Sequence, residues 1–248
     1  MYLKEKEQVR MKHKSSVTPV LLKYARHVGP IKCIFDCGSR DALDGLELYK
    51  ELSASELHCF EPNPQAIKLC KNNIAKLGSA VNAKVIPCAI TEKSGMATFY
   101  AIDREKTVTP HEDGNIGASS LYKANPDYHH ERYVAQPIQV KTISLDDYCR
   151  SNAIPDLLWL DLQGAEAMAL KGSKAILSSV KLIQVEIGFR KIYLEQASFA
   201  DVDGLLKEQF ELVDLDVGRW PRIPKIYTAL GFGPWVGNAI YVNRKFRA

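Results

Sequence analysis

Carboxylates stand at the carboxyl ends of several predicted strands, and these residues are the best placed to do chemistry. The apolar run 157–160 leads directly into Asp161, which is typical of a strand buried on both faces of a parallel sheet. Ligands of open α/β sheets bind just beyond the carboxyl ends of the strands. We therefore expect Asp161 to point into a site, with Glu166 one helical turn behind it. Capping of the helix that follows is the alternative role for Asp161.

A second predicted strand, residues 181–187, contains Glu186 near its carboxyl end. A buried carboxylate needs a partner. This strand should neighbour that of Asp161, and two carboxylates on adjacent strand ends can hold a divalent cation, share a proton or bind substrate hydroxyls. A hydrogen bond from a backbone N–H is the structural alternative.

Two earlier strand ends favour a nucleotide-containing ligand. Strand 31–35 is followed by Asp36, Gly38 and a helix; the glycine lets the backbone come close to a ligand, and the helix N-terminus offers free N–H groups. Glu61 ends strand 56–60 and lies 25 residues after Asp36, near the offset of about 20 residues at which an acidic side chain binds ribose hydroxyls. A carboxylate can accept both hydrogen bonds of a vicinal diol. The glycines of the dinucleotide fingerprint are absent.

The elements that must position these residues alternate along the chain. An amphipathic helix is expected over 17–28, a helix over 64–77 with Leu77 on its inner face, and two closing strands over 210–216 and 237–242. This order predicts an α/β fold with a doubly wound, Rossmann-like sheet. We expect a tail and helix over 1–29 and a single domain over 30–248. The irregular stretch 102–136 has the length of a functional lid or insert.

Composition limits the classes of function. The chain has 248 residues and a formal net charge of +4, too small and too dispersed to indicate nucleic-acid binding. We expect no membrane span and no signal peptide. The six cysteines contain no C-x-x-C pair, so buried free thiols, no metal site and a cytoplasmic location are expected.

Three segments resemble the FkbM-type methyltransferases, which use S-adenosylmethionine (SAM). They are Asp-Leu-Gln-Gly-Ala-Glu at 161–166, Phe-Glu-Pro-Asn-Pro at 60–64 and Asn-Ile-Gly-Ala-Ser-Ser-Leu at 115–121, and the resemblance extends from about Ile34 to Val242. It implies a seven-stranded, mostly parallel sheet whose last strand is antiparallel. The implied reaction is transfer of a methyl group from SAM to a hydroxyl of a sugar or a glycosylated metabolite.

The resemblance also implies site residues. It makes Asp161 the candidate base or substrate anchor, with Glu186 and Glu166 as alternatives. Asn115, Ser119 and Ser120 would donate hydrogen bonds at the reaction centre. The cofactor would contact Asp36, Gly38, Ser39, Arg40, Glu61, Pro62, Asn63, Cys88 and Ala89.

The chain departs from the family pattern in one loop. Many relatives have Asn and Gly where this sequence has Arg40 and Ala42. Because alanine does not cheaply adopt a glycine conformation, we expect the loop to run differently. Arg40 is expected to contact the methionine carboxylate of the cofactor or an anionic substrate.

Several alternatives stay open. His129 and His130 could accept a proton, and Trp220, Tyr227 and Trp235 could stack on a sugar ring. The fold could serve as a non-catalytic binding module, or the acceptor could be a nucleic acid or a protein instead of a saccharide. A nicotinamide-dependent dehydrogenase is disfavoured by the missing glycines. The sequence leaves homo-oligomer formation open.

Overall fold

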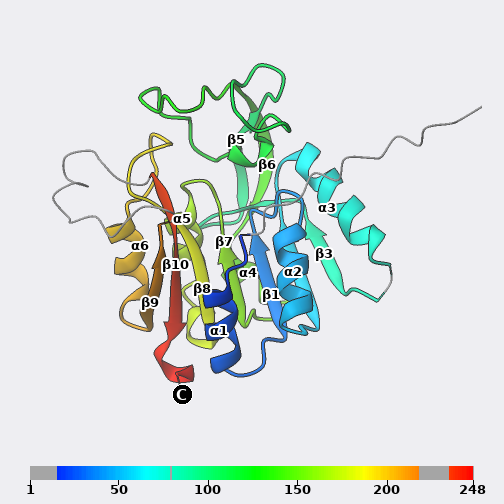
Figure 1. Cartoon of the computed structure of the whole chain (residues 1–248), viewed down its shortest axis with the longest axis vertical. Helices are drawn as coiled ribbons and strands as arrows, with labels where there is room; N and C mark the ends of the chain where they lie inside the picture. Colours follow the sequence, from blue (N-terminus) through cyan, green and yellow to red (C-terminus); the bar gives the residue numbers. More distant parts are fainter. Residues whose placement is uncertain (1–15, 79, 218–234, 248) are drawn as a thin grey trace, which may run out of the picture.

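A seven-stranded sheet forms the centre of the computed structural model, which describes residues 16–78, 80–217 and 235–247 (Figure 1). Strand β10 runs antiparallel to both of its neighbours, and the other strands are parallel to one another. The predicted sheet with an antiparallel last strand is therefore confirmed. In spatial order the strands are β3 (Ala83–Ile86), β2 (Glu56–Phe60), β1 (Cys33–Cys37), β7 (Leu157–Leu160), β8 (Leu182–Gly188), β10 (Val236–Asn243) and β9 (Phe210–Asp216).

Helices cover both faces of this sheet. Side chains of α1, α2 and α3 pack with Ile34, Leu57 and Leu157 on one face, while side chains of α4, α5 and α6 pack with Phe35 and Leu158 on the other. The alternation along each strand sends successive side chains into opposite layers. The helices are α1 (Pro19–His27), α2 (Leu43–Glu51), α3 (Pro64–Lys76), α4 (Leu145–Tyr148), α5 (Glu166–Lys171) and α6 (Phe199–Leu206), with short 3-10 turns η1 (Ile116–Ala118), η2 (Leu177–Ser179) and η3 (Arg244–Phe246).

A second, three-stranded sheet lies beyond the carboxyl ends of the main strands. It consists of β4 (Ala89–Ile90), β6 (Ala135–Ile143) and β5 (Gly95–Ile102), with β5 and β6 antiparallel (Figure 1). The predicted irregular stretch 102–136 connects β5 to β6. Isolated bridges join this stretch to β5 at Tyr100–Ser120 and to the segment after β8 at Ala124–Tyr193. A third bridge, Val108–Arg132, lies within the stretch.

The loop between β1 and α2 differs from our expectation. Ala42 has φ +65° and ψ 8°, so it adopts the left-handed conformation that favours glycine, and Arg40 also has a positive φ of 50°. The expectation that alanine would reroute the loop is therefore wrong. Tertiary contacts hold this loop in place: the methyl group of Ala42 is fully buried, Asn73 Nδ2 donates to the carbonyl oxygen of Asp41 at 2.9 Å, and the N–H of Arg40 donates to Glu61 Oε2 at 2.9 Å. Such local strain costs about 1–3 kcal/mol.

The structure contradicts the predicted inner position of Leu77, and it does not describe two of the aromatic residues suggested for stacking on a sugar. Leu77 follows the last residue of α3 and is 51% exposed, since Ala66 and Cys70 form the buried stripe of that helix. Trp220 and Tyr227 lie outside the described residues. Among the described helices, none has the length and apolar character needed to cross a membrane.

We predict that Gly38→Ala destabilises the protein by about 3 kcal/mol or more, measured by urea denaturation. Gly38 has φ +90°, and a methyl group there would overlap the backbone carbonyl of Asp161. The left-handed conformation costs an alanine about 1–2 kcal/mol, and overpacking against backbone adds to it. Gly78→Ala is the matched control, because Gly78 has φ +75° and open space around it. Equal losses in the two variants would contradict close packing of the loop on Asp161.

Candidate active site

Two pockets meet at the carboxyl ends of β1 and β7. The first has an empty volume of about 480 Å³ and the second about 830 Å³. The residues that line both are Gly38, Arg40, Gly117, Asp161 and Gln163.

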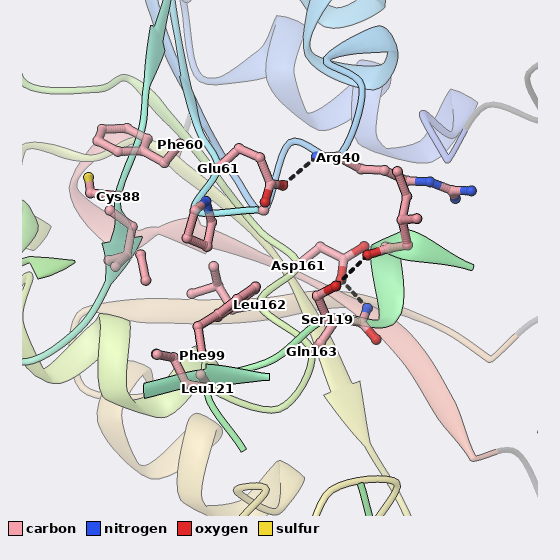
Figure 2. A pocket seen from close by; sticks show the side chains of 17 residues that line it. Arg40, Phe60, Glu61, Cys88, Phe99, Ser119, Leu121, Asp161, Leu162 and Gln163 are labelled. Carbon is pink, nitrogen blue, oxygen red and sulfur yellow. Dashed lines mark hydrogen bonds between the residues drawn. The ribbon is translucent and has the colours of Figure 1, made fainter. Parts of the chain in front are cut away.

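The first pocket has apolar walls and a few polar groups. Figure 2 shows Phe60, Cys88, Phe99 and Leu121 on one side of the view and Arg40, Asp161 and Gln163 on the other. Of the nine residues that the sequence suggested for cofactor contact, six line this pocket: Gly38, Arg40, Glu61, Pro62, Cys88 and Ala89. An apolar pocket can hold an aromatic base, and a carboxylate beside it can bind the diol of an attached sugar.

Glu61 is the buried carboxylate of the first pocket, only 6% exposed. Its Oε2 accepts a hydrogen bond from the N–H of Arg40 at 2.9 Å, and its Oε1 accepts one from the N–H of Asn63 at 2.7 Å. Burial raises the pKa of Glu61 to about 7, and the two backbone hydrogen bonds act in the opposite direction. Each oxygen keeps a second lone pair that can accept a ligand hydroxyl.

Three predicted contact residues support the loops instead of lining the first pocket. The side chain of Asp36 lies against α2, where a methyl group on Gly45 would overlap it. Ser39 donates its hydroxyl proton to the carbonyl oxygen of Asp36 at 2.7 Å. Asn63 caps α3 by accepting from the N–H of Gln65 at 3.0 Å, as the sequence predicted.

Asp161 and Glu186 lie side by side at the junction of the pockets. Leu160 pairs with Val185, so the next residue of each strand faces the other, as predicted. Gln163 approaches both: its amide Nε2 lies 2.6 Å from Asp161 Oδ1 and 3.2 Å from Glu186 Oε2. Burial raises the pKa of both carboxyl groups, and the negative charge of Asp161 raises that of Glu186 further. Such a pair can share a proton.

Besides predicted residues such as Asn115, Asp161 and Glu186, the second pocket is lined by groups that the sequence did not single out. Glu131 accepts from Asn115 Nδ2 at 2.9 Å and from the Tyr133 hydroxyl at 3.1 Å. Tyr128 and Ile192 complete its wall. Glu131, Tyr133 and Tyr128 come from the segment 102–136, whose lack of periodicity left no signal for them.

Arg40 is engaged within the protein. Its guanidinium forms an ion pair with Asp113, and the guanidinium holds the pKa of that carboxyl below its usual range although burial opposes it. The predicted contact of Arg40 with an anion would have to compete with this pair.

Other predicted catalytic and substrate-binding groups make internal bonds. Glu166 Oε1 accepts from the N–H of Leu162 at 2.8 Å and of Gly164 at 3.1 Å, and burial raises the pKa of Glu166 to about 7. Ser119 donates to the carbonyl of Ile116 at 2.7 Å, and Ser120 to that of Gln163 at 2.8 Å. Their hydroxyl protons are thus already used, because the turns they belong to need satisfied backbone carbonyls.

The paired histidines lie outside both pockets. His129 and His130 are exposed and pack edge-on against Trp235, with ring centroids 6.1 and 5.4 Å from the indole. Arg190 lies over the same indole at 4.9 Å. The ring of Trp235 is therefore already in contact with several side chains.

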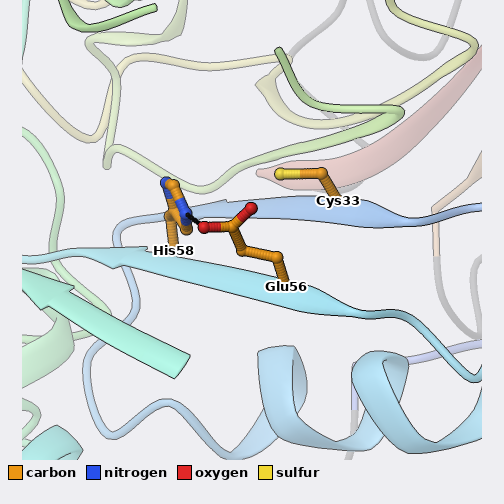
Figure 3. Close-up of side chains that lie close together, drawn as sticks. All are labelled: Cys33, Glu56 and His58. Carbon is orange, nitrogen blue, oxygen red and sulfur yellow. Dashed lines mark hydrogen bonds and ion pairs between the residues drawn. The ribbon is translucent and has the colours of Figure 1, made fainter. Parts of the chain in front are cut away.

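A separate cluster of Cys33, Glu56 and His58 lies on the neighbouring strands β1 and β2, of which Cys33 and Glu56 are the first residues (Figure 3). Glu56 Oε1 contacts His58 Nε2 and Lys84 Nζ, each at 2.7 Å, and Tyr148 bonds the other ring nitrogen of His58 at 3.0 Å. Burial lowers the pKa of His58, which favours the neutral ring. Both ring nitrogens and the carboxylate thus have partners within the protein, which is the arrangement of a satisfied buried histidine.

A family model described as the methyltransferase FkbM domain matches residues 36–211. The chain belongs to the FkbM methyltransferase family. As an FkbM enzyme it is a SAM-dependent methyltransferase, and SAM is its cofactor.

Similar proteins include two named methyltransferases. The 2-O-methyltransferase NoeI of Sinorhizobium fredii is 28% identical over 197 residues, which cover 78% of this chain and 76% of NoeI. The methyltransferase sdnD of Sordaria araneosa is 24% identical and covers 56% of this chain and 59% of sdnD. Among solved structures, a putative tRNA (m1A22) methyltransferase of Streptococcus pneumoniae in complex with S-adenosyl-L-methionine aligns with a TM-score of 0.47 and 10% identity, covering 92% of this chain and 73% of that one.

We predict that Asp36→Asn makes the protein less sensitive to rising pH. Asp36 is 3% exposed, its Oδ2 has no hydrogen-bond partner, and burial raises its pKa from 3.8 to about 8. The folded state therefore binds a proton that the unfolded state has lost, and this stabilisation disappears as pH rises from about 4 to about 8. Over that range the free energy of unfolding of the wild type should fall relative to the variant by more than about 1 kcal/mol.

Denaturation curves at several pH values measure this difference. Glu208→Gln, at an exposed carboxyl, is the control and should give a flat difference. A flat difference for Asp36→Asn as well would show that Asp36 is ionised in the folded protein.

Proposed function

We propose that this methyltransferase transfers the methyl group of SAM to a hydroxyl oxygen of a neutral sugar or a glycosylated small molecule. The observation that carries the proposal is the position of Asp161, which lines both pockets at their junction. A carboxylate at that point can contact a hydroxyl in one pocket while the methyl donor occupies the other. NoeI, the relative named as a 2-O-methyltransferase, supports oxygen as the acceptor atom.

The first pocket suits the nucleoside half of SAM. The two oxygens of Glu61 can accept the hydrogen bonds of the ribose diol. Phe99, Leu121 and Leu162 provide apolar walls for the adenine ring, next to Cys88 and Ala89. Gly38 and Asp161 line the end of this pocket where the methionine part of SAM would lie.

The second pocket suits an uncharged, hydroxyl-rich acceptor. Its ionisable lining includes Glu131, Asp161 and Glu186, whereas the cation Arg40 is paired with Asp113. Carboxylates and phenols bond sugar hydroxyls well, and the carboxylates repel phosphate, so the pocket disfavours a nucleic-acid acceptor. In this proposal residues 102–136 act as the lid, since Glu131 and Tyr133 come from them, and residues 30–248 form the catalytic domain.

The reaction requires alignment and removal of one proton. When bound, SAM would supply a methyl group on a positively charged sulfur, and the sulfur would leave with the electron pair of its bond as the acceptor oxygen bonds the methyl carbon. Asp161 holds the acceptor hydroxyl against that methyl group, and alignment of this kind accounts for a large part of such rate enhancements. The hydroxyl proton passes to the Asp161–Glu186 pair, and the walls of both pockets limit the access of water.

We predict that Glu61→Ala weakens binding of SAM and of its demethylated product, S-adenosylhomocysteine (SAH), by more than about tenfold, the effect of losing charge-assisted hydrogen bonds. Calorimetric titration measures both affinities. Glu208→Ala is the matched control, because it removes an exposed carboxylate outside the pockets. Unchanged affinity in Glu61→Ala would place the ribose elsewhere.

We predict that Asp161→Asn still binds SAM and SAH but loses turnover by about 100-fold or more, the contribution typical of a general base. The measurement is transfer of labelled methyl from SAM to a panel of neutral mono- and oligosaccharides. Glu166→Gln serves for comparison, since Glu166 bonds only its own turn. Wild-type turnover in Asp161→Asn would remove Asp161 from the chemistry.

A further inference from the structure

The hydroxyl of Tyr193 faces two acceptors although it has one proton. Its oxygen lies 2.8 Å from the backbone carbonyl oxygen of Ala118 and 2.8 Å from Gln163 Oε1. Tyr193 is 2% exposed, so water does not relieve the conflict from outside. A single O–H can satisfy only one of these oxygens at a time.

Gln163 stands between this hydroxyl and the carboxyl pair. One end of its amide faces Tyr193, and the other faces Asp161 at 2.6 Å and Glu186 at 3.2 Å. A separation of 2.6 Å is short for N–H···O and typical of O–H···O. The backbone of Gln163 has φ +52°, so the side chain is held in this place by a strained turn.

An amide can turn end for end with little change in shape, and here both orientations have partners. With the nitrogen toward the carboxyls, it donates to an ionised pair while Tyr193 donates to Oε1. With the oxygen toward the carboxyls, it accepts from a protonated carboxyl. The nitrogen then donates to the Tyr193 oxygen, and the Tyr193 proton goes to Ala118. The second orientation is satisfied only when the pair has gained a proton.

We propose that Gln163 is a positioning residue whose amide turns end for end when the Asp161–Glu186 pair takes up the proton of the acceptor hydroxyl. The inference rests on the proposed function, which supplies that proton. The proton balance is complete: the acceptor O–H bond breaks, the proton binds the pair, and no other proton leaves or enters. The turned amide stabilises the product state through Tyr193 and Ala118.

Other charged and titratable groups surround the pair. Those that face it from neighbouring elements are Arg40 from the β1–α2 loop, Asp44 from α2, Glu61 from the end of β2, Glu166 from α5, and His111, Tyr128, Glu131 and Tyr133 from the segment 102–136. They set the absolute pH at which the pair ionises. The variants below leave all of them in place, so a shift between variants reports the amide.

The test measures the ratio of SAH to SAM dissociation constants by calorimetric titration between pH 5 and 9. SAM has a positive charge that SAH lacks, so the negatively charged, ionised pair favours binding of SAM. The ratio of the two dissociation constants therefore changes as the pair ionises. The pH at the midpoint of that change reports the ionisation of the pair. When the pair is ionised, Tyr193 makes one hydrogen bond, to Gln163 Oε1. When the pair is protonated, Tyr193 makes two, one from the Gln163 amide nitrogen and one to the carbonyl oxygen of Ala118. Tyr193→Phe therefore destabilises the protonated pair more than the ionised pair. The midpoint should therefore fall by about half to one pH unit, equivalent to one neutral hydrogen bond.

Two comparisons isolate the amide. In the Gln163→Leu background, Tyr193→Phe should cause no further shift, because the coupling group is gone. Tyr148→Phe removes a partly buried tyrosine hydroxyl that bonds His58, outside both pockets, and should leave the midpoint in place. An unchanged or raised midpoint in Tyr193→Phe, or a fall that persists without Gln163, overturns the inference.

Failure of the proposed function gives a different result. In that case Asp161→Asn would keep the turnover of the wild type. Failure of the inference alone leaves the Asp161→Asn result intact and abolishes only the midpoint shift.

Discussion

The contact of the Gly38 backbone with the carbonyl of Asp161 is the constraint on which the site depends. It brings the loop after β1 against the end of β7, so that both pockets share one wall. The N–H groups of Gly38 and Ser39 donate to the carbonyl of Phe60 at 3.0 and 3.2 Å, which ties the end of β2 to the same point. Three neighbouring strands therefore end in one rigid unit. Glu61 and Asp161 are held in fixed relation because no side chain separates these backbones.

The same edge of the sheet concentrates buried carboxyl groups. Burial raises the pKa of Asp36, Glu61, Asp161, Glu166 and Glu186. Backbone N–H groups offset part of that cost at Glu61 and Glu166, and the amide of Gln163 does so at the Asp161–Glu186 pair. Asp36 has no such compensation at Oδ2. Buried carboxyl groups thus lower the stability of the protein at the edge where the proposed chemistry occurs. Groups with shifted pKa values of this kind are common at functional sites.

Much of this arrangement could be predicted from the sequence. The apolar runs predicted the strands. The position of Glu186 near the end of its apolar run predicted that it lies beside Asp161, because neighbouring parallel strands end at the same edge of the sheet. The conformation of Ala42 could not be predicted, since burial and contacts from other segments impose it against local preference. Tyr193, Glu131 and Tyr133 were missed for a related reason: their partners are distant in sequence, and the segments that contain them have no period.

The most direct test of the account is the structure of the enzyme in complex with SAH. The account predicts that the ribose hydroxyls bond the Glu61 carboxylate and that the sulfur faces Asp161 at the junction of the two pockets. A nucleoside bound away from Glu61, or a sulfur directed away from Asp161, would contradict it.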